Sequence, residues 1–428
     1  MKIAYIAAGA AGMYCGSCLH DNTLAAALIK KGQEVALIPT YTPLRTDESD
    51  VSIDTVFFGG INIYLQQKFS LFRHTPRFLD KLFDGPKLLN WVSRKSSMNN
   101  ARELGELALA TLRGEEGNLR KEIVRLSAWL RDEYKPDIIQ LTNSMFAGMV
   151  HQIKSDIDVP ILCAMQGEDI FLEGLPEPYK SDVLALLRKR AGEIDGFIAT
   201  SSYYADFMTS YLQTPAERIH VVRLGINTLD HGLIEKKADA DQFVVGYLAR
   251  ICPEKGLHNL IEAIALLRRK VPDTNLQFKV AGYLGKRDHH YFQECKKRVL
   301  QLGLQDIFDY RGEVDRSGKI AFLNSLDVLS VPTVYQDPKG LFMLEAMANG
   351  VPVIQPEHGA FPEMIDATGG GLVVEPNSPT ALAEGLEKLH QDIELRHRLG
   401  QAGKQAIFSK FTAEHMAERT LGVYQKFL

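Results

Sequence analysis

The chain has 428 residues, of which 45% are hydrophobic and 24% charged, and its formal net charge is −4. This balance is typical of a globular protein with two or three domains, and it gives no reason to expect nucleic acid as a partner. No apolar run reaches the roughly 18–20 residues of a membrane span. Five cysteines in a chain of this length do not indicate a disulfide framework, so we expect a cytoplasmic protein.

The first half alternates short apolar runs with helical stretches, which is the pattern of a parallel sheet covered by helices. A strand over 2–8 is followed by a helix over 22–31, and the turn between them contains Gly9, Gly12 and Gly16. Further strands are predicted at 138–141, 161–165, 196–200 and 220–223. The polar segment 229–242 breaks the pattern and is the predicted linker between two domains.

The second half repeats this alternation and begins with a strand over 243–248. A helix over 256–268 is expected next, because Pro253 suits a first helical turn. Later strands are predicted at 277–281, 307–310, 328–331, 351–354 and 372–374. A long helical stretch, broken near Phe411, ends the chain.

The segment 337–354 reads D-P-K-G-L-F-M-L-E-A-M-A-N-G-V-P-V-I and places two carboxylates around a helix start. A helix that begins just after a parallel strand offers backbone N–H groups and a positive dipole end to an anion. Here the donors would come from Gly340, Leu341 and Phe342. Side chains of a helix lean toward its N-terminus, so Glu345 points to the same place, and Asp337 lies in the loop ahead. Carboxylates accept hydrogen bonds from sugar hydroxyls, so a diphosphate flanked by two sugars would satisfy the arrangement.

Two cations, Arg250 and Lys255, follow the strand over 243–248 and precede another helix start. Together they could neutralise a diphosphate leaving group without a metal. The alternative is that both are solvated side chains at a helix terminus, which is the favoured interpretation of the pair in isolation. The neighbouring block at 337–354 favours the functional one.

These blocks resemble the donor site of retaining glycosyltransferases of family 4, which have the two-domain GT-B fold. The family has an E-P-F-G-L-x-x-x-E-A-M-A-x-G-x-P-V-I-like block, in which Asp337 takes the place of the first Glu and Lys339 that of Phe. The resemblance implies that Glu345 binds ribose hydroxyls and Asp337 hexose hydroxyls of a nucleotide-diphosphate sugar. The family's G-R-x-x-x-x-K-G pattern implies that Arg250 and Lys255 grip the donor phosphates.

Three further positions are candidates for donor binding. Gln166 stands where family 4 often has a His-Gly pair, and its amide could donate to a sugar hydroxyl but could not take a proton. The turn around Gly12 could bring backbone near a phosphate or an acceptor, and Val314 lies in a loop that resembles the one contacting the base. Glu168 and Asp169 are either acceptor-side carboxylates or N-caps of the next turn.

Two other features have a structural and a functional interpretation. Cys15 and Cys18 lack a second ligand pair for zinc, and buried thiols are a better interpretation than a redox pair. The stretch 57–95 mixes aromatic and basic residues. It could make a weak peripheral membrane contact, but helices with solvated basic faces are favoured.

The sequence therefore predicts an α/β protein with the GT-B fold, in which two Rossmann-like domains with parallel sheets face a central cleft. Residues 1–228 would form the acceptor-side domain, 243–405 the donor domain, and 406–428 a helix packing back on the first domain. The expected activity is metal-independent hexose transfer with retention to a hydroxyl acceptor, with a nucleotide sugar as co-substrate and no cofactor. Alternatives are a GT-B epimerase or phosphorylase, or a degenerate nucleotide-sugar-binding protein.

Overall fold

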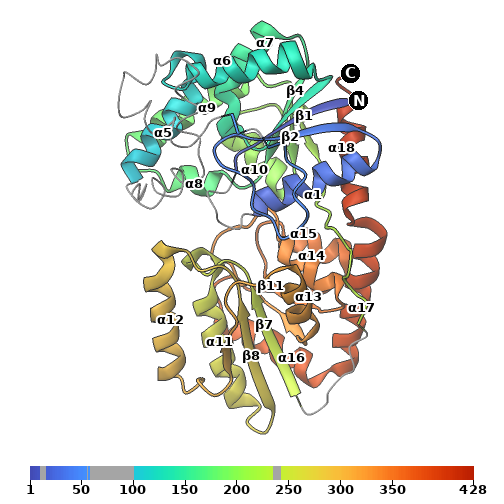
Figure 1. Cartoon of the computed structure of the whole chain (residues 1–428). Helices are drawn as coiled ribbons and strands as arrows, with labels where there is room; N and C mark the ends of the chain where they lie inside the picture. Colours follow the sequence, from blue (N-terminus) through green and yellow to red (C-terminus); the bar gives the residue numbers. More distant parts are fainter. Residues whose placement is uncertain (10–15, 55, 58–100, 235–241) are drawn as a thin grey trace. The chain divides into compact units, whose positions relative to one another are not determined.

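The computed structural model describes residues 1–9, 16–54, 56–57, 101–234 and 242–428 (Figure 1). The chain divides into two compact units. The first comprises Met1–Val222 together with Ala417–Leu428, and the second comprises Arg223–Met416. Both units are built on a sheet of six parallel strands with helices, which confirms the predicted α/β class.

The sheet of the first unit has the strand order β2-β1-β3-β4-β5-β6. Its strands are nearly continuous apolar runs, as expected for a sheet with both faces covered. They are β1 (Lys2–Ala7), β2 (Glu34–Pro39), β3 (Ile138–Leu141), β4 (Ile161–Met165), β5 (Gly196–Ala199) and β6 (Ile219–Val221). Strand β1 pairs with both β2 and β3, so the chain order reverses at the boundary between β1 and β3.

Helices surround this sheet, and the end of the chain joins them. They are α1 (Gly16–Lys30), α5 (Ala101–Arg113), α6 (Arg120–Trp129), α7 (Val150–Asp156), α8 (Asp169–Glu173), α9 (Tyr179–Ala191) and α10 (Ser202–Leu212). The last helix, α18 (Ala413–Tyr424), is tied to the unit by Tyr424, whose hydroxyl donates to Gln140 Oε1 over 2.6 Å. Lys31 Nζ forms an ion pair with Glu418 over 2.6 Å.

The sheet of the second unit has the order β12-β11-β10-β7-β8-β9. Its strands are β7 (Gln242–Leu248), β8 (Asn275–Ala281), β9 (Phe308–Tyr310), β10 (Val328–Leu329), β11 (Val353–Pro356) and β12 (Gly371–Val374). The order reverses between β7 and β10, which are hydrogen-bonded neighbours. In open α/β sheets, ligands bind outside the carboxyl ends of the strands at such a switch point.

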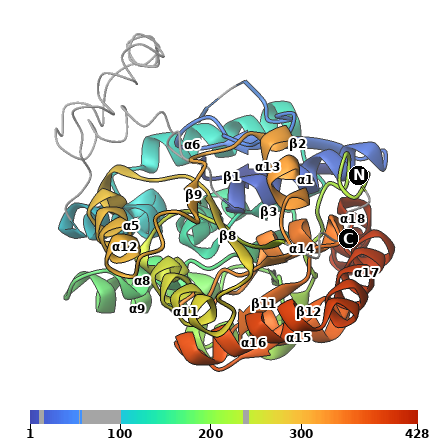
Figure 2. The same cartoon turned by 90° about the horizontal axis from the view of Figure 1, so that it is seen from below.

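Helices cover both faces of the second sheet. They are α11 (Leu257–Lys270), α12 (His289–Gln301), α13 (Arg316–Asn324), α14 (Leu341–Ala348), α15 (Phe361–Thr368), α16 (Pro379–Gln391) and α17 (Ile393–Lys410). Helices α11 and α16 pack together, and α14 packs against α17. Figure 2 shows α11 and α16 on one face of the sheet and α13 and α14 on the other.

Most predicted strands lie where the sequence placed them, but some boundaries differ. The helix predicted over 22–31 begins earlier, at Gly16. Asn22 is buried inside this helix, where its side-chain amide donates to Ser49 O over 3.0 Å. Residues 223–228 lie in the second unit instead of the first. The N–H of Ile226 donates to Phe411 O over 2.9 Å, and Ile226 O accepts from Ala413 over 2.8 Å.

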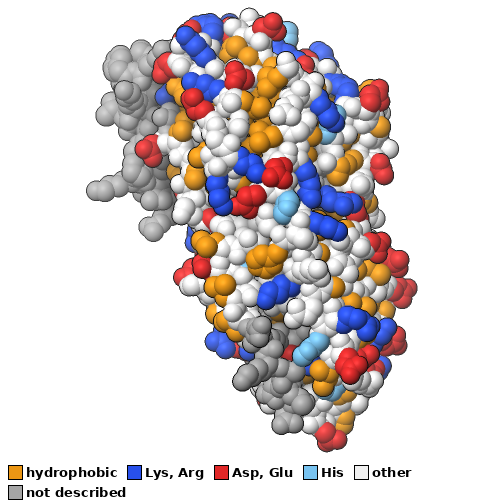
Figure 3. All heavy atoms as spheres, turned by 90° about the vertical axis from the view of Figure 1, so that its right-hand side faces the viewer, with side chains coloured by type: hydrophobic (Ala, Val, Ile, Leu, Met, Phe, Trp, Pro, Cys, Tyr) orange, Lys and Arg blue, Asp and Glu red, His pale blue; other side chains and the backbone are white. Residues whose placement is uncertain are grey.

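The described part of the face that carries α17 and α18 has charged side chains of both signs. Figure 3 shows Lys and Arg side chains interspersed with Asp and Glu on the face that carries α17 and α18. This mixture agrees with the small net charge. Among the described residues, no helix is long and apolar enough to cross a membrane.

Candidate functional site

The predicted donor residues lie at the switch point of the second sheet. Strand β7 ends at Leu248 and is followed by the loop that carries Arg250 and by a 3₁₀ turn, η6 (Pro253–Lys255). Strand β10 ends at Leu329 and is followed by the loop to Gly340, where helix α14 begins. The carboxyl ends of two neighbouring strands therefore bring both blocks to one edge of the sheet, where open α/β sheets bind their ligands.

The two loops touch through their backbones. Val334 N–H donates to Glu254 O over 2.9 Å. Gly256 has a φ of +70°, and a Cβ atom at this position would lie 1.8 Å from Pro332 O. Glycine is needed here for both reasons, because it adopts this backbone conformation without strain and leaves room for the second loop.

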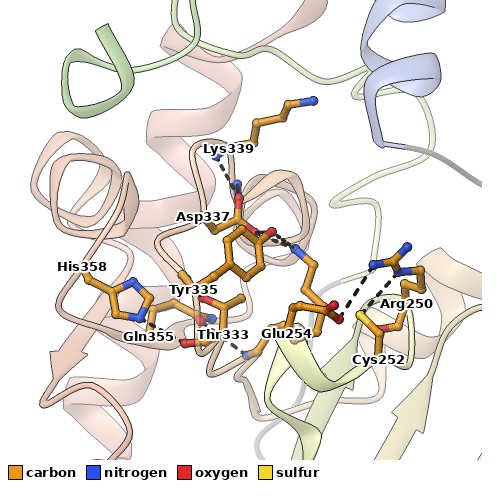
Figure 4. A network of polar contacts seen from close by, with 12 residues as sticks. Arg250, Cys252, Glu254, Thr333, Tyr335, Asp337, Lys339, Gln355 and His358 are labelled. Atoms are coloured by element: carbon orange, nitrogen blue, oxygen red, sulfur yellow. Dashed lines mark hydrogen bonds and ion pairs between the residues drawn. The ribbon is translucent and has the colours of Figure 1, made fainter. Parts of the chain in front are cut away.

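Lys255, Tyr335 and Asp337 form a closed cluster between these loops (Figure 4). Lys255 Nζ lies 2.6 Å from Asp337 Oδ2 and 2.7 Å from the Tyr335 hydroxyl. The same hydroxyl donates to Asp337 Oδ2 over 2.8 Å. Burial and the neighbouring Asp337 carboxylate raise the pKa of Tyr335 well above its usual value, so Tyr335 stays a hydrogen-bond donor.

Asp337 also binds the backbone just before helix α14. Its Oδ1 atom accepts from the N–H of Lys339 over 2.9 Å and from that of Gly340 over 3.2 Å. The side chain is almost fully buried, and burial by itself would raise its pKa. The charge of Lys255 and hydrogen bonds from Lys255, the Lys339 N–H and Tyr335 outweigh burial and lower the pKa of Asp337 to about 2. Asp337 is therefore an anion already seated at the helix start.

Arg250 lies beside this cluster and has other partners. Its Nε donates to Cys252 Sγ over 3.3 Å, and its Nη2 lies 4.0 Å from Glu254 Oε2. About a third of its side chain is exposed (37%), so the guanidinium can reach a ligand outside the loops. Figure 4 shows the Arg250 guanidinium facing Cys252 and Glu254, without a contact to Asp337.

Glu345 lies one turn further along helix α14 and is also buried. Its Oε1 accepts from Lys319 Nζ on α13 over 2.5 Å. Phe342, which was predicted to line the site, is buried, and its ring centroid lies 5.9 Å from that of Phe361. Leu341 and Val314 were predicted to lie there as well, and both are half-buried against the same core. Sequence reasoning missed Tyr335 and Lys319, and the position of Tyr335 two residues before Asp337 was the available signal.

Gln166 lies in the first unit, at the end of β4, where its side-chain amide is engaged. Gln166 Nε2 donates to Asp21 Oδ1 over 2.7 Å and to Thr142 O over 2.9 Å. Asp21 also accepts from the hydroxyl of Tyr5 over 2.6 Å. Contact between Gln166 and a donor sugar stays a prediction. It would require a sugar hydroxyl to compete with Asp21 and Thr142 for the N–H groups of the amide. Gly12, also predicted to lie near the donor, is outside the described residues.

The two carboxylates after Gln166 have different surroundings. Glu168 Oε1 accepts from the N–H and hydroxyl of Ser144 over 3.1 and 2.7 Å, and Oε2 accepts from the Gln166 N–H over 2.7 Å. Glu168 therefore links the ends of β3 and β4. Asp169 begins α8 and accepts from the Tyr204 hydroxyl over 2.6 Å. Burial raises the pKa of Asp169.

The remaining predicted features are only partly covered. Cys15 and residues 58–95 lie outside the described residues, whereas Cys18 is buried. Phe57 is buried, and its ring centroid lies 5.1 Å from that of Trp129. Among the described residues, no group of three or more His, Cys, Asp or Glu side chains could hold a metal ion. A cytoplasmic location and a weak membrane contact stay predictions.

Comparison with known proteins agrees with this geometry. The protein-family model named glycosyl transferases group 1 matches residues 233–406. The family model named glycosyltransferase family 4 matches residues 92–229. Together the two models cover more than half of the chain. The chain belongs to these glycosyltransferases.

Relatives of this glycosyltransferase are similar at moderate identity. An alpha-maltose-1-phosphate synthase of Mycolicibacterium smegmatis is 30% identical over 54% of this chain and 63% of its own length. The alignments with the first curated relatives span between 59% and 69% of those proteins.

Solved structures show the fold of this glycosyltransferase. A sucrose-phosphate synthase of Thermosynechococcus elongatus has a TM-score of 0.72 at 18% identity and covers 99% of this chain and 98% of its own. The Anabaena protein HepE, solved in complex with UDP-glucose, has a TM-score of 0.66 at 17% identity, with full coverage of both chains. The predicted GT-B fold is thereby confirmed; the placement of the two sheets about a central cleft stays a prediction.

Proposed function

We propose that this glycosyltransferase moves a hexose from a nucleotide-diphosphate sugar to a hydroxyl acceptor, with retention of anomeric configuration and without a metal. The observation that carries the proposal is the meeting of Lys255 with the start of helix α14 at the switch point of the second sheet. The UDP-glucose bound in the structure of the Anabaena protein HepE supports a nucleotide sugar as donor.

The donor diphosphate would lie at the start of α14. A helix leaves its first N–H groups without intrahelical partners, so those of Leu341 and Phe342 can donate to phosphate oxygens. Lys255 supplies a cation that is mostly shielded from solvent, and Arg250 supplies a more exposed one. In a partly buried site, both charges stabilise a diphosphate more strongly than they would in water.

Donor binding would exchange the partners of Lys255 and Asp337. Both oxygens of the Asp337 carboxylate are occupied, so a hexose hydroxyl can bind it only in place of one of them. Lys255 Nζ would exchange Asp337 for a phosphate oxygen. The Oδ2 atom that this releases would then accept from the hexose hydroxyl, while Oδ1 keeps its bonds to the helix start. Asp337 thus keeps the hexose-binding role that the family resemblance implies.

The chemical step would break the bond between the anomeric carbon and the diphosphate oxygen. The acceptor oxygen would form its bond to the same carbon on the same face, and its proton would pass to the departing phosphate. The electron pair of the broken bond stays on the diphosphate, where Arg250 and Lys255 stabilise the charge. This route requires no protein base and no metal.

The proposal is tested by transfer assays after a thermal-shift panel of nucleotide-diphosphate sugars has selected the donor. Lys255→Ala and Arg250→Ala should each lower kcat/KM by about 10²-fold or more, the usual cost of losing one group that stabilises a developing charge. Lys270→Ala is the matched control, because Lys270 forms an exposed ion pair with Glu387 on the same unit. Equal turnover of Lys255→Ala and Lys270→Ala would contradict the assigned role.

Three further readouts separate the parts of the proposal. Nuclear magnetic resonance of the fresh product should show the same anomeric configuration as the donor, and inversion would contradict retention. Turnover should persist with a strong chelator present. Incubation with the donor alone should give little product, whereas an isomerised nucleotide sugar would identify an epimerase.

A further inference from the structure

Lys319 and Glu345 form a buried ion pair between helices α13 and α14. Lys319 Nζ lies 2.5 Å from Glu345 Oε1, and each residue exposes only 8% of its surface. The pairs of Lys270 with Glu387 and of Arg268 with Asp306, in contrast, lie at the surface. Solvent-exposed pairs contribute little, whereas a buried carboxylate without a partner is strongly unfavourable. Lys319 is therefore the described partner that compensates the burial of the Glu345 side chain.

The two oxygens of Glu345 are not equivalent. Oε1 accepts from Lys319, while Oε2 accepts no hydrogen bond from any residue that the structure describes. The side chain keeps 11% of its surface exposed, so the carboxylate is not sealed off. The main chain of Glu345 is fixed as well, because its carbonyl accepts from Asn349 Nδ2 over 2.8 Å. One oxygen is thus held in place and the other is presented as an acceptor.

Helix α13 connects this ion pair to the loop that was predicted to contact the base. Asp315 caps the helix, its Oδ1 accepting from the Gly318 N–H over 2.7 Å, and Val314 directly precedes it. Lys319 lies one turn after this cap. Helix α13 therefore fixes both the loop around Val314, which was predicted to contact the nucleobase, and Lys319, which pairs with Glu345.

We propose that Lys319 is a positioning residue of the donor site, which holds Glu345 Oε1 so that Oε2 accepts a hydrogen bond from a ribose hydroxyl. This inference rests on the proposed function and deepens it. Without Lys319, the Glu345 carboxylate would lose the contact that fixes its direction, and Oε2 would no longer be directed at the ribose. The site would then bind a ribonucleotide no more tightly than the corresponding deoxyribonucleotide.

The inference predicts an energetic coupling between Lys319 and the ribose 2′-hydroxyl. Binding of uridine diphosphate and of 2′-deoxyuridine diphosphate is measured by calorimetry, with the guanosine pair in parallel. The wild type should bind the ribonucleotide about tenfold more tightly, because a hydrogen bond to a charged group is lost with the hydroxyl. In Lys319→Met this ratio should fall close to one, whereas Lys319→Arg and the surface control Lys270→Met should keep it.

Each outcome is decisive. An unchanged ratio in Lys319→Met, even with weaker binding of both nucleotides, would overturn the inference, because it would show that Lys319 contributes charge without positioning Glu345. A wild type that binds none of the nucleoside diphosphates of the thermal-shift panel, the adenosine, guanosine and uridine forms included, would refute the proposed function itself, and the inference with it. Melting temperatures check folding; if Lys319→Met does not fold, Lys319→Gln replaces it and should show the same reduced ratio.

Discussion

Replacing Asp337 by Asn should destabilise the protein by an amount that depends on pH. The folded-state pKa of Asp337 is about 2, against an ordinary value of 3.8. Each pH unit of difference between the folded and unfolded pKa is worth about 1.4 kcal/mol, so the ionised carboxylate contributes about 2 kcal/mol. Because the pKa is lowered, this stability is fully present above about pH 4 and is lost as the pH falls toward 2. About half of it should be gone at pH 3.

The measurement is urea unfolding of the wild type and Asp337→Asn at several pH values between 7 and 3. The substitution also removes the counter-ion of Lys255, a loss that is already contained in the roughly 2 kcal/mol. Other carboxylates titrate in both proteins, so they cancel in the difference between the two unfolding free energies. That difference should shrink by about 1 kcal/mol between pH 6 and pH 3.

Asp306→Asn is the matched control, since Asp306 pairs with Arg268 at the surface. Solvent screens this pair, so the difference from the wild type should stay within a few tenths of a kcal/mol at each pH. A difference for Asp337→Asn that is the same at pH 6 and pH 3 would show that Lys255 and the helix start do not hold the carboxylate ionised. The account of the cluster would then be wrong.

Two further substitutions test the packing around the site and the end of the chain. Gly256→Ala should lower the free energy of unfolding in urea by at least about 3 kcal/mol, because the added Cβ would clash with Pro332 O. Gly303→Ala has the same φ of +70° but open space, so about 1 kcal/mol is expected, and equal costs would refute the steric argument. Tyr424→Phe should cost about 1–3 kcal/mol by leaving the buried Gln140 acceptor unpaired, and an unchanged unfolding midpoint would show that this bond does not hold the C-terminal helix.

The sequence predicted the strands well because a strand buried on both faces consists almost entirely of apolar residues. The segments 138–141 and 161–165 coincide with β3 and β4, which are buried along their whole length. The strand predicted over 328–331 forms ladder pairs only at Val328 and Leu329, because the chain then turns into the loop of the site. Where a strand ends depends on how far the neighbouring strands extend beside it. A local sequence pattern carries no information about those neighbours.

The candidate site was predictable only in part. The resemblance located Lys255 and Asp337, but it did not show that they pair with each other across 82 positions of sequence. Nor did it indicate Lys319, whose importance comes from facing Glu345 across two helices. Spacing within a motif predicts which residues gather at a helix start. It does not predict which of them neutralise one another, because that depends on the approach of separate loops.

The second unit is, in terms of chain connectivity, an insertion into the first. It begins at Arg223 and ends at Met416, and the segments next to these ends pair through a parallel bridge between Ile226 and Thr412. Its entry and exit points are therefore neighbours, the arrangement in which whole domains are exchanged most readily. A chimaera that takes a relative's donor specificity would transplant this internal segment and leave both chain ends, including the C-terminal residues from Ala417 onward, in place.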